Sequence, residues 1–221
     1  MRLKDALAIY LKEQRPRIDK EYAWPLPKNM PVSIEFPPGQ GFSKNLYLRS
    51  VLHAKLAENS PESDTIQVWY VRDWGGIKGN KKETLSGYLR KSNEELILLG
   101  KSGVASWSKM LTLRDPSRYA IYDARVAMSL NSIQRIYEVS DARLFPQLVS
   151  RNSDIIRAQT KIKASGYFKF TYADSDFYKR YLDLLMEASE GVEGLNLQIA
   201  EMILFAFAED LAKEAWPDAA A

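Results

Sequence analysis

The stretch EELILLGKSGVASWSKML, residues 94–111, places two glycines between two apolar segments. It contains Gly-Lys-Ser, the end of the nucleotide-binding pattern G-x-x-x-x-G-K-[ST]. Counting back from Gly100, the first glycine of that pattern would fall at position 95, which is Glu95. The nucleotide-binding interpretation fails there. What remains is an apolar helix, a Gly-x-x-Gly turn and a second helix, the outline of a helix-hairpin-helix over about 92–113.

Local capping signals on both sides support this outline. Ser92 followed by Glu95 matches a capping box. Gly100 suits the left-handed residue that ends a helix. Asp123 is expected to begin another helix, because Val126, Leu130 and Ile133 follow at helical spacing.

The remaining chain also predicts helices, and the expected fold is a mostly α single domain over 1–221, with two lobes as an option. Strand-like alternation is scarce. The segments 24–41 and 74–82 are expected to be irregular, and 140–174 to hold short helices and loops. Helices are predicted over 1–20 with a stop or bend at Pro16, over 43–58 with Leu46, Val51, Leu52 and Leu56 inside, over 64–73 in preference to a strand, over 83–88, and over 175–191 and 195–216 near the C-terminus.

Composition excludes several kinds of chemistry. The 221 residues contain no cysteine, and His53 is the one histidine. Disulfides, thiol catalysis, cysteine-bound metals and a histidine-based triad are therefore not expected, and no cofactor or metal is predicted. No apolar run approaches the roughly 20 residues that span a bilayer. We expect a soluble cytoplasmic protein, with nothing that demands more than a monomer.

Positive charge is concentrated around the hairpin. The net charge is +3, yet residues 78–118 carry nine basic and four acidic side chains, or +5. A basic block can contact a phosphate backbone, and it can also be only a solvated surface. The hairpin favours phosphate, because Gly100 and Gly103 allow close approach, Lys101 and Ser102 add donors, and the following helix N-terminus is positive.

The order GKSGVAS, DPSRY, Ala120-Ile121-Tyr122 and then Asp123 resembles the helix-hairpin-helix DNA glycosylases, especially the 8-oxoguanine DNA glycosylase branch. The resemblance covers about 64–135, and 175–216 loosely. It implies a DNA-binding enzyme that flips a damaged or modified base out of the duplex and excises it, with Asp123 stabilising the cationic sugar or activating the nucleophile. Asp is also a preferred helix N-cap, so a purely structural Asp123 stays open.

The resemblance also implies where a covalent lysine would stand. Bifunctional members carry it two or three residues before the small pair Ala105-Ser106, and that place falls here on Gly103, or on Val104 in a shifted alignment. Neither is a nucleophile. Lys101 suits phosphate better, and Lys109, one turn beyond the pair, would need an unusual pocket that desolvates its amine. The sequence therefore predicts a monofunctional enzyme that uses water, or a non-catalytic relative.

The loop WGGIKGNKK, 74–82, falls where this superfamily inserts residues beside the extruded base. Trp74, Lys78, Asn80, Lys81 and Lys82 are candidates for wedge or phosphate contacts, and Trp69 and Trp74 for stacking on a base. Trp69 fits a core position equally well. Two alternatives to the enzyme remain: a non-catalytic helix-hairpin-helix DNA-binding protein in genome maintenance or phage defence, and a helical protein-interaction domain.

Overall fold

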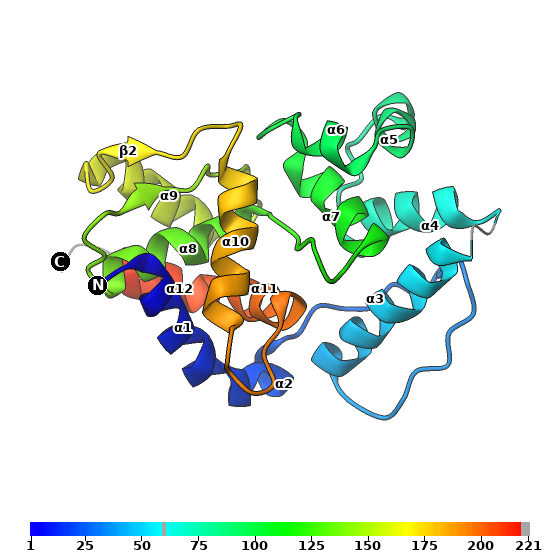
Figure 1. Cartoon of the computed structure of the whole chain (residues 1–221), viewed down its shortest axis with the longest axis horizontal. Helices are drawn as coiled ribbons and strands as arrows, with labels where there is room; N and C mark the ends of the chain where they lie inside the picture. Colours follow the sequence, from blue (N-terminus) through cyan, green and yellow to red (C-terminus); the bar gives the residue numbers. More distant parts are fainter. Residues whose placement is uncertain (59–60, 218–221) are drawn as a thin grey trace.

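The computed structural model describes residues 1–58 and 61–217, and this part of the chain is mostly α-helical, which confirms the predicted fold class (Figure 1). The predicted hairpin forms α6 (Asn93–Ile97) and α7 (Val104–Arg114), joined by turns over 98–103. The capping box is present, since Ser92 Oγ accepts from the N–H of Glu95 and the Glu95 carboxylate accepts from the N–H of Ser92.

Both hairpin glycines adopt the left-handed backbone that the turn requires. Gly100 has φ 56° and Gly103 has φ 69°, a region that glycine enters without a Cβ clash. A Cβ at Gly100 would lie 2.8 Å from the carbonyl oxygen of Asp174, so the turn also packs closely on the segment before α10 (Phe177–Ser189). The turn is therefore held in one conformation by its own backbone and by its neighbour.

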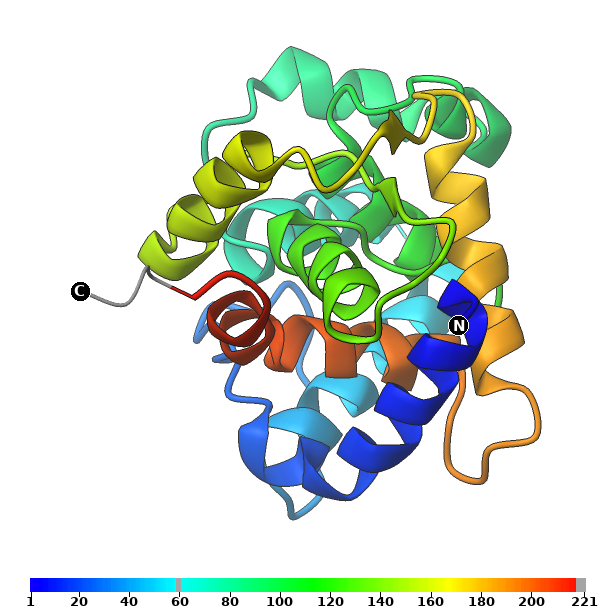
Figure 2. The ribbon, with the colours of Figure 1, turned by 90° about the vertical axis from the view of Figure 1, so that its left-hand side faces the viewer.

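Helix α8 (Ala124–Ile136) lies at the centre of one half of the molecule. Its side chains Val126, Leu130 and Ile133 are fully buried, as their spacing predicts. It contacts four helices, and Figure 2 shows it lying among the helices of this half. These neighbours are α1 (Leu3–Gln14), α9 (Ser153–Ser165), α11 (Leu197–Ala206) and α12 (Ala208–Ala215).

The other half is built around α7. Helix α3 (Gly41–Ala57) and the pair α4 (Ser63–Trp69) and η2 (Tyr70–Trp74), a π-helical segment, pack on it, and α5 (Lys82–Leu89) packs on α4. The predicted helix at 64–73 is thus confirmed. Between the halves, the chain bends at Pro16 through the 3-10 turn η1 (Arg15–Arg17) into α2 (Ile18–Glu21) and then runs as an irregular segment up to α3.

Two sequence expectations about helices are wrong in detail. The single helix predicted over 195–216 breaks at Phe207 into α11 and α12, and both sides of the break are buried in the core. Helix α3 buries Asn45, Leu48, Arg49 and Leu52, so of the four predicted inner residues only Leu52 is fully buried. The reason is that α3 contacts α2, α4 and α7 at once, and its buried surface is not one apolar stripe.

The segment 140–174 contains little regular structure besides α9, as expected. Strands β1 (Arg143–Leu144) and β2 (Phe170–Thr171) pair in parallel, with Arg143 opposite Phe170. The segment is tied to α8, because the amide of Asn131 both donates to and accepts from the backbone of Phe145. Among the described residues, no helix is both long and apolar enough to cross a membrane.

Candidate functional site

A small enclosed pocket lies between the two halves of the molecule, directly under the segment that joins them. Its volume is ≈ 30 Å³, the share of about one water molecule. Three of its lining residues have acidic or basic side chains, and four are aromatic, an unusual mixture for so small a space. The lining comprises Tyr22, Trp24, Trp74, Gly75, Lys109, Ile121, Asp123, Glu201 and Phe205.

Asp123 reaches this pocket from the N-cap of α8. Its Oδ1 accepts hydrogen bonds from the backbone N–H groups of Arg125 at 2.9 Å and Val126 at 3.1 Å. Within the described chain, Oδ2 receives no hydrogen bond. The cap therefore fixes the carboxylate with one oxygen and leaves the other for the pocket.

Lys109 reaches the same pocket from the middle of α7. Its side chain is buried, and its Nζ donates to the carbonyl oxygen of Ala105, one turn earlier, at 2.9 Å. Gly75 makes room for it, because a Cβ there would lie 2.7 Å from Cδ and Cε of Lys109. The unusual pocket that the sequence analysis required for Lys109 is thus present.

Burial lowers the pKa of Lys109 below its ordinary value, and the positive charge of Arg49 acts in the same direction. The carboxylates of Asp123 and Glu201 oppose this shift without cancelling it. A lysine amine in a dry site loses its proton more readily, and this increases the neutral, nucleophilic fraction near pH 7.

Glu201 of α11 lines the pocket and forms an ion pair with Arg49 of α3. The Nη1 atom of Arg49 lies 2.5 Å from the Glu201 Oε2 atom and 2.7 Å from the Gln198 Oε1 atom. Both partners of this ion pair are almost completely buried. Burial raises the pKa of the Glu201 carboxyl, while the Arg49 guanidinium opposes that shift. The ion pair links the two halves of the molecule beside the pocket.

Aromatic rings close the pocket. Trp24 packs edge-on against Phe205 at 5.2 Å and against Trp74 at 6.2 Å between ring centroids. Its Nε1 donates to the carbonyl oxygen of Trp74 at 2.9 Å. Trp24 belongs to the irregular segment before α3 and was not among the predicted site residues. Only the proximity of aromatic residues to prolines in 24–41 could have drawn attention to it.

The wedge role predicted for Trp74 is wrong, because its side chain is only 5% exposed. Its ring stacks on Tyr70 at 4.1 Å, and its Nε1 donates to Asn45 Oδ1 at 2.7 Å. Trp74 does line the pocket, so a pocket role stays a prediction. Trp69 is a core residue, with its Nε1 bonded to the Asn29 carbonyl, and it does not line the pocket.

The hairpin turn offers the donors that a phosphate needs. Lys101, Ser102 and Gly103 are exposed, whereas Gly100 is buried under Asp174 and cannot itself contact a ligand. Within the described residues, the backbone N–H groups of Lys101 and Gly103 have no acceptor. The direct DNA contact predicted for Gly100 is therefore corrected to a supporting role in the turn.

The glycine-rich loop lies next to the hairpin. Lys78, Lys81 and Lys82 are exposed, as phosphate contacts require. Asn80 is different, because its amide donates to Ser106 Oγ at 2.7 Å and so ties the loop to α7. The DNA contact predicted for Asn80 is therefore corrected to a structural hydrogen bond. Two of the nine basic residues of the block also point inward, namely Lys109 and the half-buried Arg114, which bonds Gln67 and the Lys91 carbonyl.

A second exposed segment that the sequence analysis missed lies beside the glycine-rich loop. The side chain of Val149 is 97% exposed, and Arg151 Nη2 donates to the Gly76 carbonyl at 3.2 Å. Lys101 and Val149 line one surface depression of ≈ 340 Å³. A valine between Leu148 and Ser150 gave no signal in the sequence.

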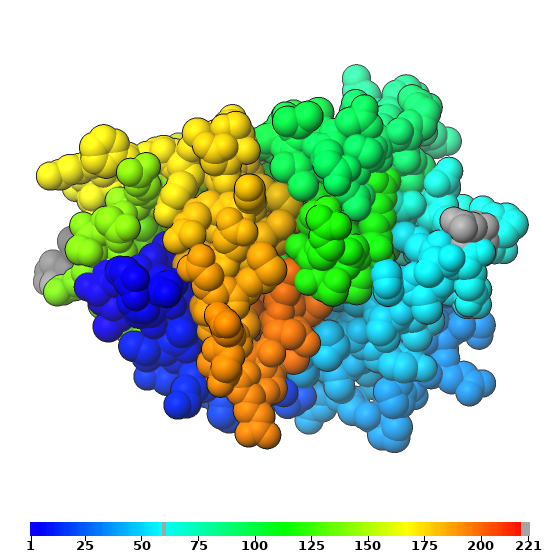
Figure 3. Space-filling model, in the orientation of Figure 1, coloured from blue at the N-terminus to red at the C-terminus, as the bar shows by residue number. Residues whose placement is uncertain are grey.

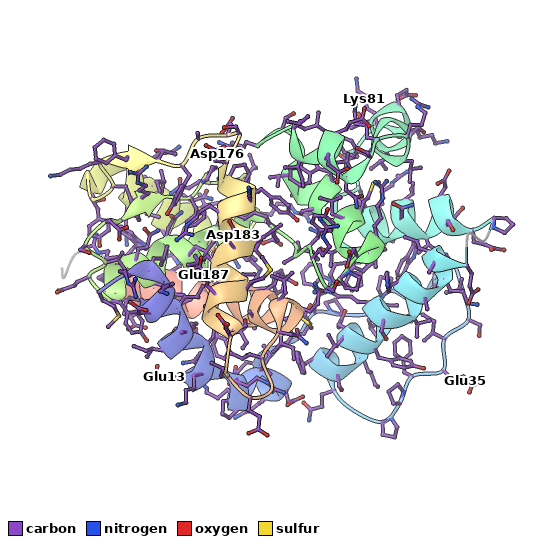
Figure 4. The ribbon with its side chains drawn as sticks, in the orientation of Figure 1. Glu13, Glu35, Lys81, Asp176, Asp183 and Glu187 are labelled. Carbon is purple, nitrogen blue, oxygen red and sulfur yellow. The ribbon has the colours of Figure 1, made fainter. Side chains whose placement is uncertain are left out.

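Helix α10 carries both acidic and basic side chains. Figure 4 shows Asp183 and Glu187 on the face of α10 that is turned to the viewer, with Asp176 at its upper end, whereas Lys81 lies at the top of the other half. Lys179 and Arg180 lie on the same helix, and Arg180 Nη1 lies 3.6 Å from Glu187 Oε1, so α10 has mixed charge. A polyanion would be attracted instead to the exposed lysines at 78, 81, 82 and 101.

A larger groove of ≈ 730 Å³ lies along the boundary between α3 and α11, which runs beside α10 in Figure 3. Its lining is mainly apolar, with Phe42, Leu46 and Leu197. The polar amide of Gln198 is already engaged by the carbonyl groups of Pro116 and Tyr119. Among the residues that line the groove, Arg49 alone has a charged side chain, and it is paired with Glu201, so the small pocket is the better candidate for chemistry.

Comparison with protein-family models, with curated proteins and with solved structures finds no match for this chain. The case for a function therefore rests on the geometry of the pocket and the hairpin.

Proposed function

We propose that this protein is a DNA base-excision enzyme, which flips a damaged or modified base from the duplex and cleaves its N-glycosidic bond. The observation that carries the proposal is the position of Asp123, whose fixed carboxylate shares an enclosed pocket with a buried amine, 20 residues after the exposed turn at Gly103. The resemblance of the sequence to the helix-hairpin-helix glycosylases supports the same reaction.

The hairpin and the lysine-rich loop would hold the phosphate backbone. Exposed N–H groups at Lys101 and Gly103, together with the ammonium groups of Lys101 and Lys78, provide charge-assisted donors. Such contacts are independent of sequence and position the duplex without reading it. Specificity would then come from the pocket that receives the flipped base.

Asp123 would act on the sugar. Cleavage of the glycosidic bond develops positive charge on the deoxyribose, and a fixed carboxylate stabilises that charge most in a site without water. Oδ1 is held by the two backbone bonds of the cap, and Oδ2 is free to face the sugar. The cap and the catalytic role are compatible, because each uses a different oxygen.

The pocket must open before a base can enter, because ≈ 30 Å³ holds about one water molecule. Trp24 is the group that would move, since it is half-buried on a segment without helix or strand and its ring closes the pocket. The closed state is also the observation that favours the second candidate, a helix-hairpin-helix DNA-binding protein without catalysis.

The test is incubation of the protein with duplex and single-stranded oligonucleotides that carry a panel of bases. The panel includes 8-oxoguanine, uracil, alkylated purines and hydroxymethylated cytosines, and alkali reveals abasic sites. Asp123→Asn should lower base release at least about a hundredfold, while DNA affinity changes little, because Asn also caps helices well. Asp176→Asn, at the exposed N-cap of α10, is the matched control.

Three outcomes would count against the enzyme in different ways. Equal base release by Asp123→Asn and the unaltered protein would remove Asp123 from the mechanism. Salt-dependent DNA binding without release of any base would establish the non-catalytic alternative. Absence of DNA binding at moderate salt would exclude both and favour a protein-interaction domain.

A further inference from the structure

Lys109 is a buried cation without a carboxylate partner. Its side chain is 4% exposed, and no ion pair to it is found among the described residues. Its one hydrogen-bond partner is a carbonyl of its own helix. Lysine is almost never buried in this way without a counter-charge, because desolvation of an ammonium costs several kcal/mol. A structural role does not explain a side chain that destabilises the fold.

The surroundings are shaped to keep this amine in place. Gly75 lies against the aliphatic part of the Lys109 side chain, and a Cβ at position 75 would clash with it. The Nζ of Lys109 donates to the Ala105 carbonyl, and Asp123 lines the same pocket. An oriented amine and an oriented carboxylate in one pocket are the groups that substitution at a sugar carbon requires.

We propose that Lys109 is the nucleophile of the reaction and attacks C1′ of the deoxyribose. This inference rests on the proposed function, and it replaces the water molecule that the sequence analysis expected. The amine comes from an unexpected position. The position at which the resemblance places the covalent lysine is occupied by Gly103 or Val104. Lys109 instead follows Ala105 by one helical turn and reaches the pocket from there.

The reaction can be written with every bond accounted for. The Lys109 Nζ–C1′ bond forms as the C1′–base bond breaks, and the base leaves with the electron pair and takes the proton that the amine loses. Opening of the C1′–O4′ bond gives an iminium ion, and O4′ leaves with the electron pair and takes a proton from water. The hydroxide so formed removes a C2′ proton, the 3′ phosphate is expelled with its electron pair, and water hydrolyses the iminium to regenerate the amine.

Asp123 would serve both stages. It stabilises the positive charge on the sugar during base loss and then the positive iminium nitrogen. A second acid–base group is available in Glu201, although Arg49 occupies one of its oxygens. The product is a strand break that appears without alkali, which distinguishes the amine from water as nucleophile.

The experiment is reduction with borohydride during incubation with a duplex that contains one abasic site, and separately with any base that the panel shows to be released. Hydride converts the iminium to a stable secondary amine, so the protein becomes covalently attached to DNA. We expect the adduct in the unaltered protein, and mass spectrometry should locate it on the peptide that contains Lys109. This second readout needs no variant and is independent of folding.

The variants Lys109→Gln and Lys109→Met should lose the adduct at least about a hundredfold, and Lys12→Gln, at an exposed lysine on α1, should keep it. The rate of adduct formation should rise with pH, because the neutral amine is the reactive form, and it should level off below the ordinary lysine pKa of about 10.4.

The possible failures separate this inference from the proposed function. Base release that needs alkali for strand breakage, with no adduct, would overturn the role of Lys109 and leave the glycosylase in place. An adduct mapped to another lysine or to the N-terminus would also overturn it. An adduct at Lys109 on the abasic duplex, with no base released from the whole panel, would support the amine and count against the base-excision function.

Discussion

The interior of this protein contains two cationic side chains that are treated in opposite ways. Arg49 is 1% exposed and has a carboxylate at 2.5 Å, a side-chain amide at 2.7 Å and the Trp74 ring beneath it at 5.5 Å. Lys109 is 4% exposed and has only the Ala105 carbonyl. Both lie near Glu201, yet only Arg49 is bonded to it.

The difference distinguishes a buried cation with a structural role from one without such a role. Arg49 connects α3 to α11, and its charge is compensated, so it can serve as an anchor between the halves. Two of its nitrogens, Nε and Nη2, have no hydrogen-bond acceptor among the described residues, and the Trp74 ring lies close to them. Lys109 bonds only to its own helix and joins no two elements. A buried charged group that lowers stability without joining elements is typical of a functional site.

The largest effect on stability should come from breaking the compensated pair. Arg49→Met leaves the buried Glu201 carboxylate without its partner, and we expect a loss of about 3–5 kcal/mol in the free energy of unfolding, because an unpaired buried charge is strongly destabilising. Urea denaturation monitored by tryptophan fluorescence measures it. The double variant Arg49→Met with Glu201→Met should recover most of the loss. A loss below about 1 kcal/mol in the single variant would contradict the anchoring role.

The opposite sign is expected for the uncompensated cation. Lys109→Met keeps the length of the side chain and removes the buried charge, so the free energy of unfolding should rise by on the order of 1 kcal/mol. For a chain of this size that corresponds to about 2–4 °C in Tm. Thermal melts of both proteins at pH 7 provide the measurement, and Lys12→Met on the surface of α1 is the control.

This gain should also depend on pH with a defined sign. The pKa of Lys109 is lowered in the folded protein, so the unfolded chain binds the additional proton between the folded pKa and about 10.4. Stability of the unaltered protein therefore rises with pH over that window, and the advantage of Met shrinks toward its upper end. A constant difference between pH 7 and pH 10 would show that Lys109 is not desolvated.

The elements around the site could be predicted because local rules determine them. Ser92 and Glu95 cap α6, Gly100 needs a left-handed backbone, and Asp123 begins α8, and each of these depends only on residues within one or two turns. The bend at Pro16 follows from a single ring. Local chemistry therefore located the hairpin and the carboxylate.

The pocket itself could not be predicted, because it depends on which helices pack together. Arg49 lies on a helix whose apolar residues suggested a different inner face, and its partner is 152 residues away. Trp24 comes from a segment with no periodicity to indicate its direction. Lys109 was considered and found doubtful, since its burial is created by Gly75 and Asp123, which belong to other elements.

A third cation extends the comparison, because Lys101 is close to Lys109 in sequence but lies in a different environment. Lys101 is exposed at the hairpin turn, so Lys101→Glu should leave the free energy of unfolding within about 0.5 kcal/mol. Its effect should fall on binding. We expect DNA affinity to drop about tenfold and the slope of log Kd against log salt to decrease by about 1, for every DNA sequence alike.

Fluorescence anisotropy with a labelled duplex at several salt concentrations measures both quantities, with Lys12→Glu as the control for net charge. The two lysines should then separate completely, since Lys109→Met loses the covalent adduct and keeps DNA affinity, whereas Lys101→Glu loses affinity and still forms the adduct at saturating DNA. An equal loss of affinity in Lys12→Glu and Lys101→Glu would show that only net charge matters, and the hairpin would no longer be the phosphate-binding element.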